Sequence, residues 1–296
     1  MNKFTLGFIG FGEAASGISR GLKESGFENI FFYDAFYNKE PMGKLIMKRA
    51  HEAKVLLCES EEVLAKNAKI IMSSVIARVA IDAADSISPF LNENHIYIDT
   101  NAASPMVKEE VSKIITATGA KFVDAALMGP IPAFLSRVPI LASGEGAYEF
   151  YELMSPYDMN IKCIGDKPGQ ASAIKMFRSI FMKGYVTLLM ETIVAANKYS
   201  ASALVLDSIA ETMDKDDFME TARLLLTRGI IHAERRSFEM AEVLKTLSTI
   251  GVDSIMSEAT KKKLQWCSEL KIKEYFNGEP PNTLEEVLEG FEAMGV

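Results

Sequence analysis

Short apolar runs alternate with stretches of helical spacing over the first 165 residues of the chain. Eight of these runs are predicted to be strands: Lys3–Gly10, Asn29–Tyr33, Lys54–Leu57, Lys69–Val75, His95–Asp99, Lys121–Ala125, Pro139–Ser143 and Asn160–Ile164. The stretches between them, of which Ala14–Glu24 is the first, have the three- and four-residue apolar spacing of helices. Near-continuous apolar strands separated by helices indicate a mainly parallel sheet with both faces covered. The pattern therefore predicts a doubly wound α/β domain.

After Gly165 the strand-like runs largely disappear and helical spacing dominates. The predicted helices are Ala171–Lys198 (mildly interrupted at Gly184), Ala201–Met213, Phe218–Met240, Ala241–Ile250 and Ser254–Phe276. The tail after Gly278 is either a short helix or a flexible end. The sequence thus predicts an α/β domain over residues 1–167 and an all-helical C-terminal domain over residues 168–296, with the boundary near Pro168.

Composition narrows the classes of partner. The chain has 296 residues, 48% of them hydrophobic, and a net charge of −8, which makes it a poor match for nucleic acid or an anionic membrane surface. No apolar run was found to approach the ~18–20 residues of a membrane span. The three cysteines and three histidines are scattered, so we expect reduced thiols, a cytoplasmic location and no metal site. Apolar residues along the long helix, among them Ile180 and Leu188, predict a homodimer through the helical domains.

A glycine-rich turn follows the first predicted strand. Gly10, Gly12 and Ala15 match G-x-G-x-x-A, in which the first glycine permits a tight turn and the second leaves room for a pyrophosphate. The second strand leads to Asp34, 22 positions after Gly12, where a carboxylate accepts hydrogen bonds from the adenosine ribose and repels a 2′-phosphate. These features predict a Rossmann domain that binds NAD in preference to NADP.

The alternative for this segment is a plain glycine turn beside a solvated aspartate. NADP stays open as the cofactor because Arg20 and Lys39 could assist a phosphate. The expected cofactor-binding residues are Gly10, Phe11, Gly12, Glu13, Ala14, Asp34, Ser74, Val75 and Asn101.

Three later segments, Asp99–Pro105, Val123–Pro130 and Gly169–Ser179, resemble the β-hydroxyacid dehydrogenase superfamily. That superfamily includes 3-hydroxyisobutyrate, tartronate-semialdehyde and 6-phosphogluconate dehydrogenases. The resemblance covers the Rossmann domain and the start of the helical domain. Beyond Ala201, the segment His232–Met240 instead resembles a bacterial branch of phosphogluconate-dehydrogenase-like NAD-binding oxidoreductases.

The resemblance implies substrate contacts in the first two segments. Asn101 stands where the family pattern D-x-S-T-x-x-P has a serine that contacts substrate, and its amide offers both a donor and an acceptor. Gly129 is retained from the S-G-G that binds the substrate carboxylate in the family. Met128 and Pro130 replace the other two residues of that motif, which weakens the case for carboxylate binding by this loop.

The third segment matches the family pattern G-x-x-x-x-x-K-x-x-x-N, whose lysine is the general acid/base. Lys175 occupies the lysine position, six residues after Gly169, and Ser179 replaces the asparagine. Four residues separate Lys175 from Ser179, so both lie on one helix face, where the hydroxyl could hold substrate or orient the lysine. Oxidising an alcohol releases a proton, and a positioned base contributes roughly 10²–10⁴-fold to such a step. The alternative is an ordinary solvated lysine.

A second cluster begins 57 residues after Lys175. His232, Arg235 and Arg236 fall at helical spacing, and an arginine pair can bind a carboxylate through two hydrogen bonds. Because the S-G-G motif is incomplete, this cluster is a candidate for the missing contact to an anionic substrate. The alternative is an exposed helix face on which glutamates pair with the arginines.

Together these features predict reversible NAD(P)-dependent oxidation of a small anionic hydroxy acid bound in a cleft between the two domains. A catalytically silent NAD(H)-binding sensor is the rival from another class, because it accounts for the substitutions at Met128, Pro130 and Ser179. A sensor has no need of Lys175. An enzyme like the imine reductases is the third alternative, although those enzymes usually place aspartate or tyrosine at the position of Lys175.

Overall fold

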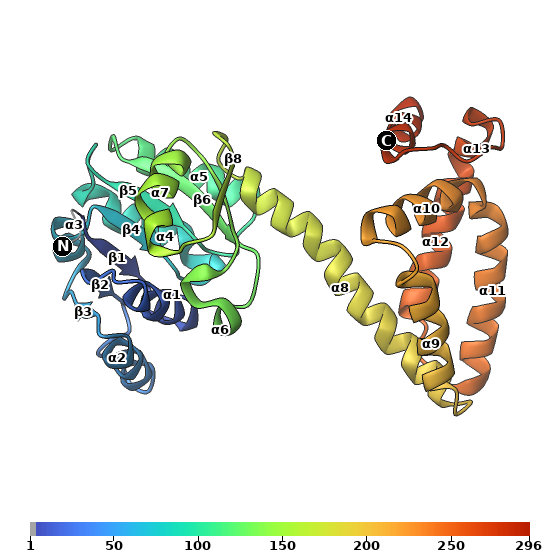
Figure 1. Cartoon of the computed structure of the whole chain (residues 1–296), viewed down its shortest axis with the longest axis horizontal. Coiled ribbons are helices and arrows are strands. Elements are labelled where there is room, and N and C mark those ends of the chain that lie inside the picture. Colours follow the sequence, from blue (N-terminus) through green and yellow to red (C-terminus); the bar gives the residue numbers. More distant parts are fainter. Residues whose placement is uncertain (1–3) are drawn as a thin grey trace. The chain divides into compact units, whose positions relative to one another are not determined.

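The computed structural model of the chain describes residues 4–296 and divides into two compact units, Met1–Ser179 and Ile180–Val296. Unit 1 is built on an eight-stranded sheet in the order β3-β2-β1-β4-β5-β6-β7-β8 (Figure 1). The strands are β1 (Leu6–Ile9), β2 (Ile30–Tyr33), β3 (Leu56–Leu57), β4 (Ile70–Ser73), β5 (Ile96–Asp99), β6 (Lys121–Leu127), β7 (Ile140–Ser143) and β8 (Ile161–Gly165). All eight predicted strands are present; Lys3, where the first was expected to begin, lies outside the described residues.

Every neighbouring pair of strands is parallel except β6 and β7, which run antiparallel. Between the strands lie α1 (Glu13–Glu24), α2 (Met42–Ala53), α3 (Glu61–Asn67), α4 (Ala80–Ile87), α5 (Pro105–Thr116), α6 (Ile131–Phe134) and α7 (Ala147–Met154). Successive strands are added on one side of β1 as far as β3, and from β4 onward they are added on the other side. This arrangement confirms the predicted doubly wound α/β fold of the Rossmann type.

Two hydrophobic cores cover the two faces of the sheet. In one, Phe8 and Phe32 of the sheet are buried with side chains of α1, α2 and α7, such as Ile18. In the other, Tyr97 and Phe122 are buried with side chains of α3, α4 and α5. Side chains alternate between the two faces along each strand, so each strand contributes to both cores. Because both faces are packed, the ends of the strands are held rigidly, and a ligand can bind there.

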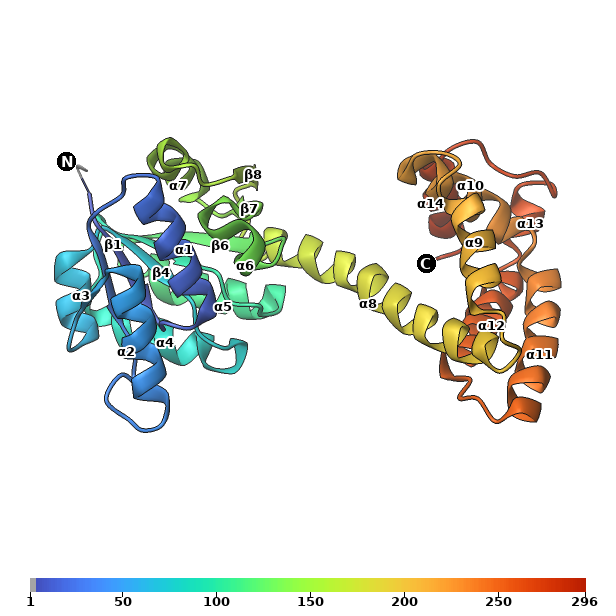
Figure 2. The same cartoon turned by 60° about the horizontal axis from the view of Figure 1, so that its bottom comes forward.

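Unit 2 is helical, as predicted, and α8 (Gln170–Asn197) enters it from unit 1 (Figure 2). The other helices are α9 (Ser202–Met213), α10 (Phe218–Ile231), α11 (Ala233–Ile250), α12 (Ile255–Glu269), α13 (Ile272–Tyr275) and α14 (Leu284–Ala293). A small core joins α10, α11, α12, α13 and α14 through Ile230, Ile231, Ala233, Cys267, Ile272 and Val287. Gly184 does not interrupt α8, and the tail after Gly278 forms the short helix α14.

Two predicted helices were placed wrongly. The helix expected over Phe218–Met240 breaks at His232, whose backbone leaves the helical region, and α11 then continues through Met240. The helix expected over Ser254–Phe276 ends at Glu269, and Lys271 adopts a left-handed conformation before α13 begins. Neither break has a glycine or proline at the turning point. Side chains on both sides of each break are buried in the core of unit 2. Local sequence patterns do not reveal such packing.

The surface of α8 is unusually apolar. This helix is long and apolar enough, by length and composition alone, to cross a membrane, so the expectation that no stretch approaches that length was wrong. Large side chains such as Ile180 (74% exposed) and Met190 (61% exposed) lie on its surface. Exposed apolar surfaces of this kind are typical of sites that contact a protein partner or a membrane.

Candidate functional site

The turn between β1 and α1 has the geometry that a bound pyrophosphate requires. Gly10 has φ +79°, and its N–H donates to the carbonyl of Tyr33 at 2.8 Å. A Cβ on Gly10 would lie 2.7 Å from Val75 Cγ1, so the turn also needs glycine for space. A Cβ on Gly12 would meet nothing within 4 Å, which leaves open space in front of the N-terminus of α1. That space fits a phosphate group facing the helix amides.

Asp34 lies directly beside this turn, at the end of β2. One carboxylate oxygen, Oδ2, accepts from Phe11 N at 2.8 Å, and the other, Oδ1, accepts from Phe36 N at 2.9 Å. These two bonds hold the carboxylate against the glycine turn. A carboxylate has about four acceptor positions, so positions remain for the hydroxyls of a ribose.

Asn101 fastens the ends of β4 and β5 together. Its side chain is buried, Oδ1 accepts from Val75 N at 2.7 Å, and Nδ2 donates to Ser73 Oγ at 3.0 Å. The loop after β4 that contains Ser74 and Val75 is therefore held by the residue that takes the family's serine position. Both polar groups of the amide serve this link.

The catalytic candidate Lys175 is half-buried in the second turn of α8 and belongs to unit 1. The helix N-terminus is anchored on the sheet, because Ala171 N donates to Ser143 Oγ at 3.1 Å and Ser172 N donates to Asp124 Oδ2 at 2.9 Å. Ser179 Oγ donates to the carbonyl of Lys175 at 2.9 Å, a bond within the helix that leaves its lone pairs as acceptors.

Gly129 follows β6, whose neighbour in the sheet is β5. The preceding Met128 N donates to the carbonyl of Pro139 at 2.8 Å, and a Cβ on Gly129 would lie 3.2 Å from the ring of Phe134. The loop that contains Gly129 is therefore held by Pro139, the residue before β7, and packs beside the ring of Phe134 of α6.

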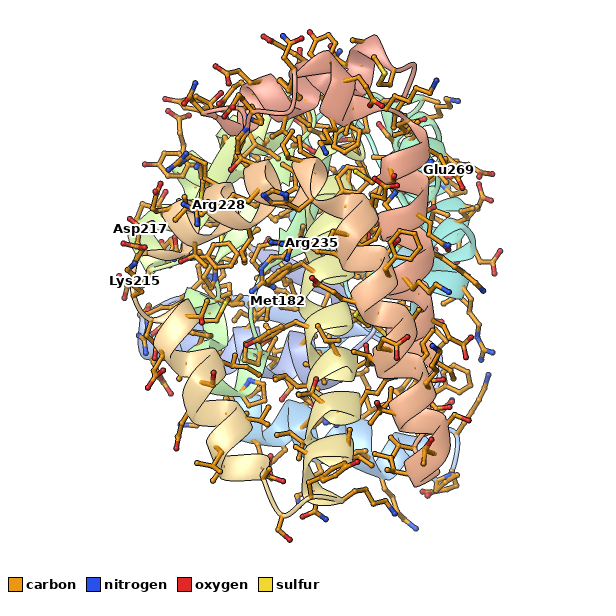
Figure 3. The ribbon with its side chains drawn as sticks, turned by 90° about the vertical axis from the view of Figure 1, so that its right-hand side faces the viewer. Met182, Lys215, Asp217, Arg228, Arg235 and Glu269 are labelled. Carbon is orange, nitrogen blue, oxygen red and sulfur yellow. The ribbon has the colours of Figure 1, made fainter. Side chains whose placement is uncertain are left out.

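His232, Arg235 and Arg236 all belong to unit 2. His232 is the residue between α10 and α11 and is exposed. Arg235 is exposed and pairs with Glu239 at 3.1 Å, whereas Arg236 is half-buried, with Nη1 3.8 Å from the Cβ position on Gly229. Figure 3 shows Arg228 of α10 and Arg235 of α11, the two helices that meet at His232.

Sequence reasoning missed the buried charges beneath the site. Lys108 Nζ lies 2.8 Å from Asp99 Oδ1 and 3.4 Å from Asp124 Oδ1, and all three side chains are fully buried. Burial raises the pKa of the Asp99 carboxyl, and Lys108 opposes that rise. A signal was present in the sequence, since Lys108 opens the buried stripe of α5, at positions 108, 111, 112 and 115, where an apolar residue is the rule.

A cavity of about 490 Å³ lies elsewhere, lined by Lys69, His95, Lys121 and Glu149 among others. Lys69, His95 and Lys121 are at the amino ends of β4, β5 and β6, whereas ligands of open α/β sheets bind at the carboxyl ends. The glycine turn, Asp34 and Asn101 lie at the carboxyl ends. Within residues 4–296 there is no group of three or more His, Cys, Asp or Glu side chains able to hold a metal ion.

The two units of the chain match two different protein families. Residues 5–156 match the family described as the NAD binding domain of 6-phosphogluconate dehydrogenase. Residues 196–267 match a domain of unknown function, DUF1932.

Individual relatives agree with these matches. A solved structure of a conserved protein, described as similar to 3-hydroxyacid dehydrogenases, is 33% identical, covers 90% of this chain and 97% of its own, and has a TM-score of 0.60. The mitochondrial 3-hydroxyisobutyrate dehydrogenase of Drosophila melanogaster is 26% identical over 43% of this chain and 37% of its own length. An imine reductase variant from Myxococcus stipitatus, solved with NAD+, shares the fold with a TM-score of 0.74 at 15% identity over 90% and 94% of the chains.

The open space at Gly12 gives a direct test of the cofactor site. Gly12→Ala should leave the melting temperature nearly unchanged, because the added methyl meets no protein atom, and should weaken dinucleotide binding by about tenfold or more, since the methyl occupies the pyrophosphate position. Gly10→Ala is the contrasting variant, and should be destabilised by at least about 1 kcal/mol through its positive φ. Calorimetric titration and thermal unfolding measure both. Unchanged dinucleotide affinity in Gly12→Ala would place the cofactor elsewhere.

Proposed function

The chain belongs to the family of the NAD binding domain of 6-phosphogluconate dehydrogenase, and on that premise we propose that it transfers hydride between NAD and a small hydroxy acid, with Lys175 as the general acid/base. The observation that carries the proposal is that α8, which bears Lys175, is anchored on strands β6 and β7 of the sheet whose carboxyl edge carries the glycine turn. The relatives whose names mention 3-hydroxy acids support a carboxylate-bearing alcohol as the substrate class.

The residues of this chain divide the work of the reaction. Gly10, Gly12 and the first amides of α1 would hold the pyrophosphate, and Asp34 would accept from the ribose hydroxyls. NAD, when bound, supplies the ring that accepts the hydride from the alcohol carbon. Unprotonated Lys175 would take the hydroxyl proton as the hydride leaves the alcohol carbon. The alcohol then becomes a carbonyl and the lysine an ammonium. In the reverse direction Lys175 returns that proton.

His232, Arg235 and Arg236 of unit 2 are proposed as the residues that bind the anionic group of the substrate, and Gly129 and Ser179 of unit 1 as further substrate-binding residues. Arginine binds carboxylates in a planar, paired geometry, and the chain lacks two residues of the family's carboxylate-binding loop, at Met128 and Pro130.

Imine reduction is the second candidate, and one observation favours it. Imine reductases share this fold at a TM-score of 0.74, above the value for the 3-hydroxyacid dehydrogenase-like structure. The hydroxy-acid assignment is preferred because the latter is 33% identical to the chain, against 15% for the imine reductase, and because Lys175 suits proton removal from a hydroxyl.

Cofactor preference follows from Asp34. Its carboxylate is fixed beside the glycine turn, where a 2′-phosphate would be repelled, so NAD should bind at least about tenfold more tightly than NADP, equivalent to about 1.4 kcal/mol. Calorimetric titration with both dinucleotides measures the difference, and Asp34→Asn should narrow it. Equal or tighter binding of NADP by the unmodified protein would refute the preference.

Removal of Lys175 tests the chemistry. Lys175→Met retains the length and helix propensity of the side chain and removes the proton carrier, so kcat should fall by about 10²-fold or more with NAD affinity nearly intact. Absorbance at 340 nm follows turnover with a panel of hydroxy acids. The matched control is Lys183→Met, an exposed lysine farther along α8, which should retain activity. Near-normal turnover in Lys175→Met would exclude the lysine as the acid/base.

The arginine cluster makes a different prediction. Arg236→Met should raise KM for the acid by about tenfold or more and change kcat little, because a carboxylate clamp contributes mostly uniform binding. Arg235→Met should have the smaller effect, since Arg235 is exposed and already pairs with Glu239. Steady-state kinetics with the acid varied at saturating NAD decides. If KM is unchanged in both variants, the anion site lies elsewhere, around Asn101 and Gly129.

We also propose that the protein is cytoplasmic and forms a homodimer through the helical units, and the exposed apolar face of α8 supports the dimer. Val186, Met190 and Val194 are exposed on one face of this helix, and a second copy of the same surface would bury them symmetrically. Light scattering at micromolar concentration should give twice the mass of one chain, and Met190→Lys should shift the equilibrium toward monomer. A monomer without detergent, or recovery of the protein with membranes, would contradict the dimer.

A further inference from the structure

A row of buried polar residues crosses the sheet at its carboxyl edge. In the strand register Ser73 of β4 pairs with Asp99 of β5, Asp99 pairs with Asp124 of β6, and Asp124 pairs with Ser143 of β7. All four side chains are fully buried on the same face as α5. Burying four adjacent polar side chains in a sheet costs free energy unless they are hydrogen-bonded, so this row is expected to have a role that apolar residues could not fill.

The row forms a continuous chain of polar contacts through unit 1. At one end Asn101 binds the loop after β4 and its N–H donates to Asp99 Oδ1 at 2.8 Å. Lys108 Nζ then spans Asp99 and Asp124. At the other end, Ser172 Oγ donates to Asp124 Oδ1 at 2.7 Å and Ser172 N donates to Asp124 Oδ2 at 2.9 Å. The contacts thus lead from the loop after β4 that contains Ser74 and Val75, here termed the cofactor-side loop, to the first turn of α8.

The charges in this chain of contacts do not cancel among themselves. Asp99 and Asp124 stand opposite each other on neighbouring strands, where like charges repel, and only one ammonium, that of Lys108, lies between them. The remaining negative charge is met at the N-terminus of α8, whose amides and partial positive charge favour a carboxylate. The first turn of α8 is thus held against Asp124 by the N–H and the hydroxyl of Ser172.

We propose that Asp124 is a positioning residue, which sets the height and rotation of the first turn of α8 and so holds Lys175, three residues after Ser172, in register with the cofactor-side loop. The role rests on the proposed function of Lys175. Asp124 acts through the helix and does not touch the reacting atoms. A displacement of about 1 Å of a catalytic group is enough to cost about 10²-fold in rate.

Asp124→Asn breaks this anchor without removing volume. Its NH2 group must face either Ser172 N–H or the Lys108 ammonium, so one donor is set against another whichever way the amide is turned. Ser172→Ala is the milder variant, because it removes only the hydroxyl contact to Asp124. Ser112→Ala is the matched control, since Ser112 is a buried serine of α5 outside this chain of contacts.

Two readouts separate positioning from a general loss of stability. Amide hydrogen exchange in the first turn of α8 should become about tenfold faster in Asp124→Asn, and less so in Ser172→Ala, while the amides of β1 and β4 are unchanged. In the dehydrogenase assay kcat should fall about tenfold or more in Asp124→Asn, with the Kd for NAD within about threefold of the unmodified protein. Ser112→Ala should match the unmodified protein in both.

The outcomes are distinguishable from failure of the proposed function. If no hydroxy acid is oxidised, locally faster exchange in α8 with intact NAD affinity still supports the anchoring of the helix by Asp124, and only the role of Lys175 falls. Unchanged exchange and kcat in Asp124→Asn would overturn the proposal, as would faster exchange throughout unit 1 with a parallel loss of NAD binding. Should Asp124→Asn fail to fold, Ser172→Ala decides by the same two readouts.

Discussion

Two carboxylates on neighbouring strands share a single buried ammonium, and the position of the long helix α8 depends on this arrangement. Asp99, Asp124 and Lys108 have no exposed side-chain surface, and the three formal charges sum to one negative charge. Breaking a buried ion pair by removing one partner typically costs about 3–5 kcal/mol, because the charge that stays behind is uncompensated. Ser172, in the first turn of α8, donates its N–H and its hydroxyl to Asp124. The helix that bears Lys175 is thereby tied to one place on the sheet.

Much of the fold could be predicted because its cause is local. Continuous apolar strands, a G-x-G-x-x-A turn and Asp34 at the end of the second strand each follow from short-range chemistry, and the structure has all eight strands. The helix breaks at His232 and Lys271 could not be found in this way, since burial of side chains distant in sequence determines where those helices stop. The long helix α8 and its apolar side chains were predicted, but its fit to the length and composition of a membrane span was not, because Lys183 and Glu191 divide its apolar sequence.

The residues of the candidate site also fall into those that sequence spacing could predict and those that it could not. Gly10, Gly12 and Asp34 were predicted from spacing, and their geometry fits a dinucleotide. Asn101 was predicted to contact ligand, and its side chain is found linking Val75 N and Ser73 Oγ. The polar row beneath the site had a visible sign only in hindsight: a lysine at a core-facing position of α5. Sequence spacing finds residues that act next to one another in the chain, whereas cross-strand register appears only in the folded sheet.

These features give a consistent physical account of a site with incomplete family motifs. Met128 and Ser179 stand where the related family has a serine and an asparagine, while the glycine turn, Lys175 and the anchor of its helix are all present. A protein that only sensed NAD would need the turn and Asp34 and would have no use for a lysine held on an anchored helix. The retained features are those that the proposed transfer of a hydride and a proton would use.

The most direct measurement is transfer of a labelled hydride. The full-length protein is incubated with NAD and small hydroxy acids that carry deuterium on the alcohol carbon, and the nicotinamide product is analysed by mass spectrometry. The account predicts reduced cofactor carrying one deuterium from at least one hydroxy acid, and none when Lys175 is replaced by methionine. Tight binding of NAD without label transfer from any of the acids, or cofactor turnover only with an imine, would contradict it.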